Sequence, residues 1–205
     1  TRVQRDEDGR VQYVEVYDTR DETIPDTVLL QPDHRLKEGT SYEVTGFVRT
    51  ATPDELRATD RDYPVWVRRE YGQLPQELPY RVRGLAYDVT VQYLDAQGTL
   101  PTRRTSSGRI PDLTSAPAYD IARAIEDYLR QFPVDYEVKG APPGQDTVDH
   151  FLFESQRGYF DYHASAMVVM LRALDIPARL AVGYVIDEKD YDADKHSYVV
   201  RDRNA

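Results

Sequence analysis

The chain of 205 residues contains no cysteine at all. Disulfide bonds and thiolate metal sites are therefore excluded, and so is any thiol nucleophile within these residues. Long apolar runs are also missing, because no stretch reaches the roughly 18 apolar residues that a membrane-spanning helix needs. Apolar residues nevertheless make up 40% of the chain, which is enough for the core of one large domain or of a small domain with an appendage.

Basic residues are scarce relative to acidic ones: 26 Lys and Arg stand against 36 Asp and Glu, and the net charge is −10. A nucleic-acid partner is excluded on this ground, because phosphate binding needs a basic face and Arg68–Arg69 and Arg103–Arg104 are short, separate clusters. The first residues are charged and show no signal peptide. Because the chain starts at Thr1 instead of Met, we expect it to be a piece of a longer protein.

Residues 1–52 are predicted to form a small β-rich N-terminal module. Apolar and polar residues alternate in Val11–Tyr17, with a slip in phase that indicates a bulge. A second alternation runs through Ser41–Thr50, and Gly39 marks a turn before it. The pattern is typical of an antiparallel sheet with one face in water.

Residues 53–116 are predicted to be a helical linker and loop region. The letters TPDE at positions 52–55 form the capping-box pattern of a helix start, with proline in the first helical position. Helical spacing of apolar residues predicts a second helix from Arg81 to Tyr93. The polar stretch from Asp95 to Ser115 is expected to be a loop or a hairpin.

Residues 117–205 are predicted to hold the main domain, whose first helix starts just ahead of it and runs from Ser115 to Gln131 with Ser115 as the N-cap. A second helix is predicted from Phe160 to Leu174, and Pro177 ends it. Its expected core face consists of Ala164, Met167, Val168, Leu171 and Leu174. The remaining expected elements are an extended segment at Val134–Val138, a short helix or turn at Asp149–Ser155, a buried strand at Ala178–Ile186 and a strand at Ser197–Asp202.

Residues 158–184 read GYFDYHASAMVVMLRALDIPARLAVGY. This stretch resembles the core of the transglutaminase-like superfamily of thiol enzymes, in particular its bacterial membrane-anchored branch, and the resemblance extends over roughly Tyr63 to Asp202. It implies an α+β fold with a papain-like or transglutaminase-like core, in which helices pack on an antiparallel sheet. Asp175 stands where the family usually has glycine at the helix end, and aspartate tolerates the left-handed backbone that such an end requires.

The resemblance also implies where a catalytic site would lie. In relatives the third residue of the GY-x-D/E-Y stretch is the nucleophilic cysteine, at a helix start whose positive end favours the thiolate. That position is Phe160 here, which can neither be deprotonated nor form a thioester, and the partner histidine and aspartate are expected beyond Ala205. We therefore predict a vestigial nucleophile position and no intact catalytic residue. The residues predicted to line the remaining cleft are Tyr159, Asp161, Tyr162 and His163.

Candidate metal ligands are dispersed. Asp190, Asp192 and Asp194 alternate as at the start of an EF-hand loop, but Lys195 and Arg201 stand where that loop needs Gly and Glu. We predict no metal site and no cofactor, and only a looser calcium site in residues 187–196 stays open as an alternative. The four histidines show no metal-ligand spacing; they are His34, His150, His163 and His196.

Loss of the nucleophile from a peptide-shaped cleft would leave a binding module. Our first hypothesis is a degenerate, non-catalytic transglutaminase-like domain that binds or scaffolds peptide, protein or cell-wall material. The resemblance alone implies an extracytoplasmic domain of a bacterial membrane protein. The alternative is an inactive fragment of an active cysteine acyl-transferase or protease whose nucleophile was changed. A second alternative is a structural spacer or dimerisation domain, because a sheet edge exposed where the chain ends would favour self-association.

Overall fold

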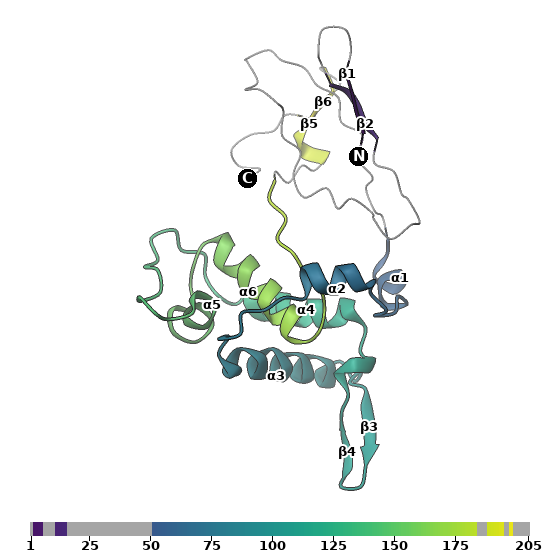
Figure 1. The fold of residues 1–205 in the computed structure, drawn as a ribbon, viewed down its shortest axis with the longest axis vertical. Coiled ribbons are helices and arrows are strands. Elements are labelled where there is room, and N and C mark those ends of the chain that lie inside the picture. The colour runs from purple at the N-terminus through teal and green to yellow at the C-terminus, as the bar shows by residue number, and fades with distance from the viewer. Residues whose placement is uncertain (1, 6–10, 16–50, 184–187, 195–196, 199–205) are drawn as a thin grey trace. The chain divides into compact units, whose positions relative to one another are not determined.

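The computed structural model of the chain divides into two compact units, residues 1–50 and residues 51–205. Figure 1 shows the ribbon with the labels used below. The structure describes residues 2–5, 11–15, 51–183, 188–194 and 197–198.

The first unit contains one antiparallel pair of strands in its described part. β1 (Arg2–Arg5) pairs with β2 (Val11–Glu15), and the register shifts between Gln4 and Arg5. The β structure predicted at the start of Val11–Tyr17 is confirmed, and the shift is an irregularity of the kind that the slip in phase indicated. The strand expected at Ser41–Thr50 lies outside the described residues.

The second unit begins with three helices: α1 (Pro53–Arg57), α2 (Val65–Tyr71) and α3 (Tyr80–Ala96). α1 starts at the predicted capping box. The Thr52 hydroxyl accepts a hydrogen bond from the Glu55 N–H at 3.3 Å, and the Glu55 carboxylate accepts one from the Thr52 N–H at 2.7 Å. α3 confirms the helix predicted from Arg81 to Tyr93.

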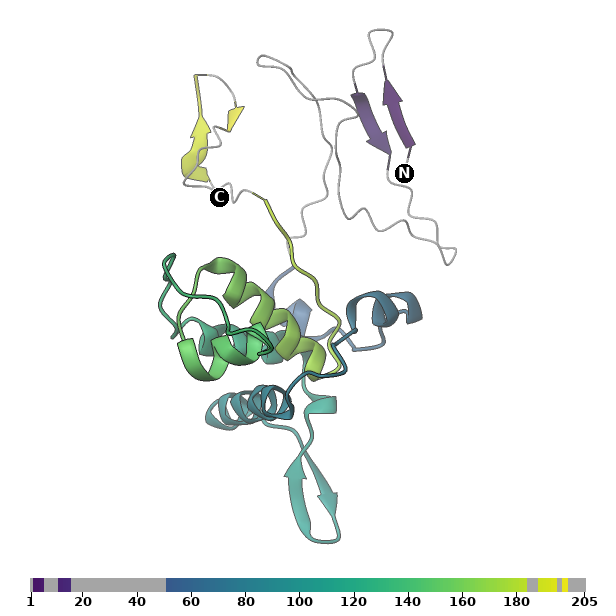
Figure 2. The ribbon, with the colours of Figure 1, turned by 60° about the vertical axis from the view of Figure 1, so that its left-hand side comes forward.

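The stretch predicted as a loop or hairpin forms an antiparallel hairpin of β3 (Thr102–Thr105) and β4 (Gly108–Pro111). Figure 2 shows this hairpin projecting away from the helices. A single 3₁₀ turn, η1 (Leu113–Ser115), follows it. The hairpin is thereby attached directly to the start of the next helix.

α4 (Ala118–Leu129) lies within the predicted range, but the predicted cap is wrong. Ser115 ends the 3₁₀ turn, and its hydroxyl donates to the Asp112 carboxylate at 3.1 Å. The N-cap position is Pro117, which makes no side-chain capping bond. Asp112 accepts from both Thr114 and Ser115, so these hydroxyls serve the turn and not the helix.

A π-helix lies between the last two described α-helices of the unit. α5 (Thr147–His150) continues directly into a π-helix, η2 (Phe151–Ser155), and these two confirm the short helix expected at Asp149–Ser155. α6 (Phe160–Ala173) confirms the second long helix. The expected extended segment at Val134–Val138 is reduced to a single parallel bridge between Val134 and Gly158.

The described part of the segment predicted as a buried strand, residues 178–183, forms no strand. Val182 is 98% exposed, so this prediction is wrong for the described residues. Ala178 is held by one hydrogen bond from its N–H to the Tyr71 carbonyl and by Arg172, which donates to its carbonyl at 2.8 Å. Beyond Ala178 no strand in the described part of the chain lies beside the segment to pair with it.

Further along, the described residues form η3 (Glu188–Asp190), β5 (Tyr191–Asp192) and β6 (Ser197–Tyr198). β5 pairs antiparallel with β6, and the rings of Tyr191 and Tyr198 meet edge-on with centroids 5.2 Å apart. The strand predicted at Ser197–Asp202 is therefore seen only over its first two residues, and the rest lies outside the described part.

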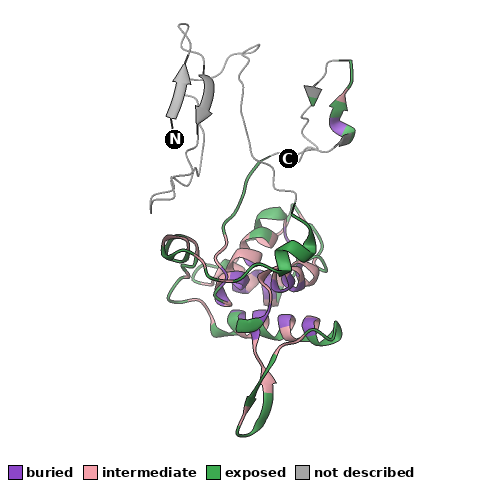
Figure 3. Cartoon of the chain, turned by 90° about the vertical axis from the view of Figure 1, so that its right-hand side faces the viewer, coloured by how far each residue is buried: buried purple, intermediate pink, exposed green. Residues whose placement is uncertain are grey.

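The hydrophobic core of the second unit lies between α3, α4 and α6, which all pack on one another. Figure 3 shows the buried residues on the helix faces that look inward. α3, in the region expected to be a linker, is part of this core. The fully buried large side chains of the core are Val82, Thr90, Leu94, Ile121, Ile125, Phe151, Leu152 and Met170.

The predicted core face of α6 is confirmed in part, because Leu171 is buried in the core and Met167 and Leu174 pack against it. Ala164 is exposed and Met167 and Val168 are only half-buried, whereas Ala166 and Met170 are fully buried. Residues 164–174 are apolar almost all round the helix, so their spacing alone leaves the orientation undetermined. Packing against α3 and α4 decides which face turns inward.

The predicted α+β class is confirmed, with helices and antiparallel strand pairs in one chain. In the described residues each sheet has two strands, and it is helices that enclose the core. No described helix combines the length and the apolar character that crossing a membrane requires.

α6 ends in a left-handed turn at Asp175, as the sequence predicted. Asp175 has a φ of +60°, its N–H donates to the Arg172 carbonyl at 3.1 Å, and the Ile176 N–H donates to the Leu171 carbonyl at 3.0 Å. These two bonds define a Schellman motif, and the buried pair Leu171 and Ile176 supplies its usual apolar contact. The helix end is therefore closed by the backbone of a non-glycine residue.

We predict that Asp175→Gly raises the free energy of unfolding by about 0.5–1 kcal/mol, because glycine adopts positive φ without a Cβ penalty. Asp175→Ala, which keeps a Cβ and loses the local tolerance of aspartate, should lower it by about 1 kcal/mol. Urea unfolding of both variants measures the two changes, and a loss of stability in Asp175→Gly would contradict the assignment.

Candidate functional site

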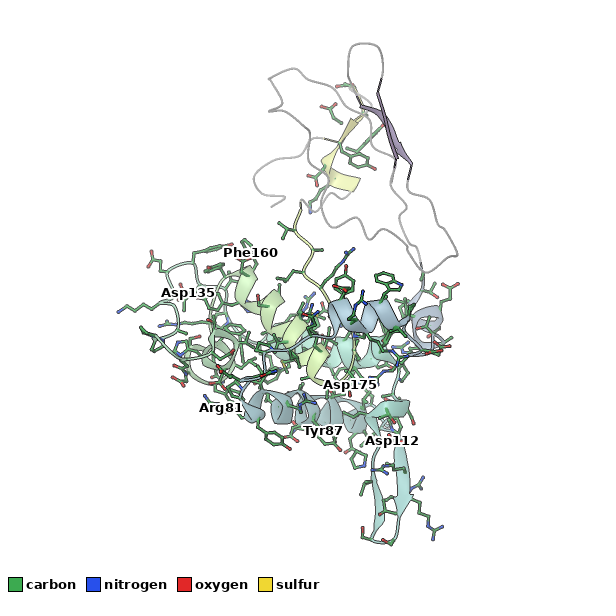
Figure 4. The ribbon with its side chains drawn as sticks, in the orientation of Figure 1. Arg81, Tyr87, Asp112, Asp135, Phe160 and Asp175 are labelled. Carbon is green, nitrogen blue, oxygen red and sulfur yellow. The ribbon has the colours of Figure 1, made fainter. Side chains whose placement is uncertain are left out.

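The predicted site lies at the N-terminal end of α6, where Phe160 is the first helical residue (Figure 4). The Phe160 side chain is 60% exposed and meets the Tyr159 ring edge-on, with centroids 5.9 Å apart. Asp161 is exposed in the first turn, where a negative charge suits the positive end of the helix. Among the described residues no side chain caps this helix, and the N–H groups of Phe160 and Asp161 have no hydrogen-bond partner there, whereas the Tyr162 N–H donates to the Tyr159 carbonyl at 3.0 Å.

The buried ring of Phe151 fixes the position of this helix end. Its centroid lies 5.3 Å from that of Phe132, 5.0 Å from that of His163 and 5.7 Å from that of Tyr162. Phe132 follows α4, whereas Tyr162 and His163 belong to α6, so one ring from the π-helix joins both. Edge-to-face pairs of this kind contribute about 0.5–1.5 kcal/mol each beyond the burial of their area.

The chain just before α6 is also tied to the chain just after α4. The Gly158 N–H donates to the Pro133 carbonyl at 3.3 Å, and the Asp135 N–H donates to the Gly158 carbonyl at 3.0 Å. A Cβ on Gly158 would lie 2.8 Å from Cγ of Tyr162, which is closer than real side chains approach. Glycine is therefore required here for the Tyr162 ring to pack over the backbone.

His163 is bonded to the backbone on both sides of its ring. Nδ1 lies 3.1 Å from the Tyr159 carbonyl oxygen and Nε2 lies 3.2 Å from the Phe132 carbonyl oxygen. A neutral imidazole donates to one of these oxygens, and a protonated ring donates to both. Both nitrogens lie beside main-chain oxygens, and a proton on Nε2 lets His163 fasten α6 to the end of α4 through the Phe132 carbonyl.

An ion pair anchors α5 to α3 below this site. The Arg81 guanidinium makes a two-pronged contact with the Asp149 carboxylate, with Nε 2.6 Å from Oδ1, and it also lies over the Phe153 ring at 4.4 Å. The Asp149 side chain is 5% exposed. Hydrogen bonding from Arg81 holds the pKa of Asp149 below its usual value, although burial acts in the opposite direction.

In the part of the chain that the structure describes, no three His, Cys, Asp or Glu side chains are grouped so as to hold a metal ion. One described hydrogen bond lies within residues 187–196. The Asp194 N–H donates to Oδ1 of Asp192 at 3.1 Å, which is a turn contact between neighbouring residues.

Residues 109–202 match the family model of the transglutaminase-like superfamily. Similar proteins include the uncharacterized protein YebA of Bacillus subtilis, 35% identical over 140 residues, which are 66% of this chain and 16% of that protein. A protein-glutamine gamma-glutamyltransferase of Pseudomonas aeruginosa is 32% identical over 84 residues, which are 41% of this chain and 12% of that protein. A solved structure, the periplasmic domain of TgpA from Pseudomonas aeruginosa bound to ethylmercury, is 26% identical to this chain. The match covers 60% of this chain and 36% of the TgpA chain, with a TM-score of 0.40.

Residues 109–202 belong to the transglutaminase-like superfamily, and the resemblance predicted from residues 158–184 is confirmed. The chain spans 16% and 12% of the two relatives' lengths, so what those whole proteins do is not thereby established for this one.

The structure separates the predicted site residues into two groups. Tyr159, Phe160 and Asp161 lie at the exposed start of α6, whereas the half-buried Tyr162 and His163 pack toward Phe151. Sequence reasoning missed three residues that position the site: Phe151, Gly158 and Arg81. A glycine immediately before a helix start was a usable signal of close backbone approach, but the Arg81–Asp149 pair joins positions too far apart in the chain for any local pattern to show.

We predict that Gly158→Ala lowers the free energy of unfolding by about 1–3 kcal/mol, because the added Cβ forces Tyr162 off the backbone. Gly140→Ala is the matched control, since its Cβ would meet the same ring only at the hydroxyl, 4.0 Å away. Denaturant titration of both variants provides the measurement. Equal costs at the two positions would show that the close approach at Gly158 does not matter.

We predict a pH-dependent effect of Asp149→Asn. The pKa of Asp149 is lower in the folded state, so ionisation stabilises the fold above the unfolded value of about 3.9, and the gain is lost as pH falls through the folded pKa. The stability deficit of Asp149→Asn should be largest at pH 5–7 and shrink below about pH 4. Urea unfolding across this range tests it, with the exposed Asp95→Asn as control; a deficit that is constant with pH contradicts the ion pair.

Proposed function

We propose that this chain is a degenerate, non-catalytic transglutaminase-like domain that binds polypeptide at the N-terminal end of α6. Phe160 carries the proposal, because the resemblance equates its position with the nucleophilic cysteine of the family. A phenyl ring has no proton to lose and no lone pair with which to attack a carboxamide. No cysteine elsewhere in the 205 residues could take over that role.

The geometry around Phe160 suits binding. Its ring is 60% exposed and stands edge-on to Tyr159, so an apolar side chain of a ligand can cover it and remove its surface from water. The amide groups of Phe160 and Asp161, the first two of α6, can donate to a backbone carbonyl of the same ligand. An apolar contact beside main-chain donors is the usual way in which an extended peptide is held.

The extracytoplasmic location remains a prediction that rests on the resemblance to the membrane-anchored branch. The enzymatic alternative has one observation in its favour: a cysteine at position 160 would lie at an uncapped helix start, where the positive end of the helix favours the thiolate. Under this alternative, the replacement of cysteine by phenylalanine at position 160 is the only change that inactivated the nucleophile position.

The test uses the 205-residue chain and a fluorescein-labelled pentapeptide with a central glutamine flanked by leucines. We expect the peptide to bind without release of ammonia, and Phe160→Ala to weaken binding by roughly three- to tenfold, because covering a phenyl face contributes about 1 kcal/mol. Fluorescence anisotropy and ammonia release are measured in the same mixture. Val65→Ala, a similarly exposed apolar residue on α2, is the control and should bind like the unmodified chain.

Unchanged affinity in Phe160→Ala, or ammonia release by the unmodified chain, overturns the proposal. A second arm tests the position itself with Phe160→Cys and Ala164→Cys, which would place thiols on the first and second turns of α6. If position 160 retains the helix-end environment of a nucleophile, iodoacetamide alkylates the thiol at 160 several times faster than the thiol at 164. Equal alkylation rates at the two positions would contradict the assignment of position 160 to the family's nucleophile.

A further inference from the structure

A cavity of about 1120 Å³ lies at the other end of α6, between α3, η1 and the β3–β4 hairpin. Figure 4 shows three of its lining residues, Tyr87, Asp112 and Asp175, where the hairpin joins the helices, and Phe160 at the opposite end of α6. α6 has 14 residues, so at 1.5 Å per residue the cavity and Phe160 are about 20 Å apart. The cavity is therefore distinct from the site at the start of α6, and we name it the α3 groove.

Four arginines line the α3 groove in a chain whose net charge is −10. Arg61 donates to the carbonyls of Leu113 and Leu174 at 2.8 and 2.7 Å, and Arg68 donates to the Tyr63 carbonyl at 2.9 Å. Arg61 thereby joins η1 to the end of α6, whereas Arg68 is bonded within its own segment of the chain. Their hydrogen-bonding capacity is directed at the protein itself.

The other two arginines of the groove, Arg83 on α3 and Arg103 on β3, are exposed, and neither makes a side-chain hydrogen bond within the described part of the chain. Arg103 has only a weak charge interaction with Asp112. Two guanidinium groups thus face one groove with their donors unused, which is the arrangement that recognises carboxylates.

Gly84 gives the groove its floor. It lies inside α3, where glycine costs about 1 kcal/mol relative to alanine, yet a Cβ added there would meet no atom within 4 Å. Packing therefore does not explain the glycine. Tyr80 and Tyr87 lie four residues before and three residues after it, on the same helix face, and Tyr80 is 85% exposed. The backbone at Gly84 therefore leaves space in the groove next to Tyr80 and Tyr87.

The lining also contains three carboxylates, Asp88, Asp112 and Asp175. An anion without hydrogen-bond donors, such as polyphosphate, would be repelled by them, whereas an acidic polypeptide offers amide N–H groups to these carboxylates and its side chains to Arg83 and Arg103. We propose that the α3 groove binds an extended acidic segment of a partner polypeptide, with its carboxylates on Arg83 and Arg103 and its backbone over Gly84 between Tyr80 and Tyr87.

Binding is tested with fluorescein-labelled hexaglutamate on the 205-residue chain, with hexaglutamine as the uncharged counterpart. We expect hexaglutamate to bind at least about tenfold more tightly than hexaglutamine and to weaken with salt. Arg103→Ala should weaken hexaglutamate binding by about tenfold, the value of one charge-assisted hydrogen bond. Arg104→Ala is the matched control: Arg104 neighbours Arg103 on β3, pairs with Arg109 and not with Ile110, and does not line the groove.

Gly84→Leu separates binding from folding. Leucine is a strong helix former and its Cβ would meet no atom within 4 Å, so the variant should be at least as stable as the unmodified chain while losing hexaglutamate affinity by tenfold or more. Equal effects of Arg103→Ala and Arg104→Ala, full affinity in Gly84→Leu, or equally tight binding of inorganic polyphosphate each overturn the proposal. Binding of the glutamine pentapeptide without binding of hexaglutamate would refute acidic-peptide binding by the α3 groove and leave the proposed function intact.

Discussion

Burial of the Phe151 ring is the constraint on which the site depends. The ring is fully buried, and its neighbours come from the segment after α4 and from the start of α6. The π-helix at this point allows an aromatic residue to turn inward directly after the short α5, and Gln156 then closes the turn in a left-handed conformation, with its N–H bonded to the Phe151 carbonyl. The start of α6 is thus positioned by the hydrophobic core, and a site built there is as rigid as that core.

α6 presents two exposed ends that are held by different forces. Its start is fixed by aromatic packing and by the close approach of Tyr162 to Gly158, and its end by the Schellman bonds around Asp175. Between them Ala166 and Met170 are completely buried, so the two ends are joined by a rigid helix. The two ends therefore differ in chemistry: one carries an exposed phenyl ring, and the other borders a groove lined by Arg83 and Arg103, which make no side-chain hydrogen bond within the described residues.

Local signals in the sequence were sufficient for most helix limits. The capping box at 52–55, the left-handed end at Asp175 and the span of α6 all follow from interactions within four or five residues. The failures have other causes. The orientation of α6 and the segment 178–183 are decided by what lies beside them in space, and nearly uniform apolar spacing in 164–174 does not encode that choice. The cap of α4 was missed because Ser115 bonds to Asp112 in the preceding turn. The same holds for the site: Phe160 could be singled out by resemblance, but the contacts of His163 with two carbonyls and the ion pair of Arg81 with Asp149 exist only in the folded chain.

The structure also explains why a phenylalanine is tolerated where the resemblance places a nucleophile. Phe160 buries little of its ring and supports none of the contacts of Phe151, so its side chain carries almost none of the stability of the helix start. Gly158 stabilises the start of α6, whereas Phe160, two residues further on, occupies the position at which the family has its nucleophile and contributes little to stability. A change at position 160 can therefore abolish thiol chemistry without loosening the domain, whereas a change at Gly158 cannot, because its Cα lies against Tyr162. Under this division a domain that has lost its nucleophile keeps its shape, and selection can retain it for what that shape binds.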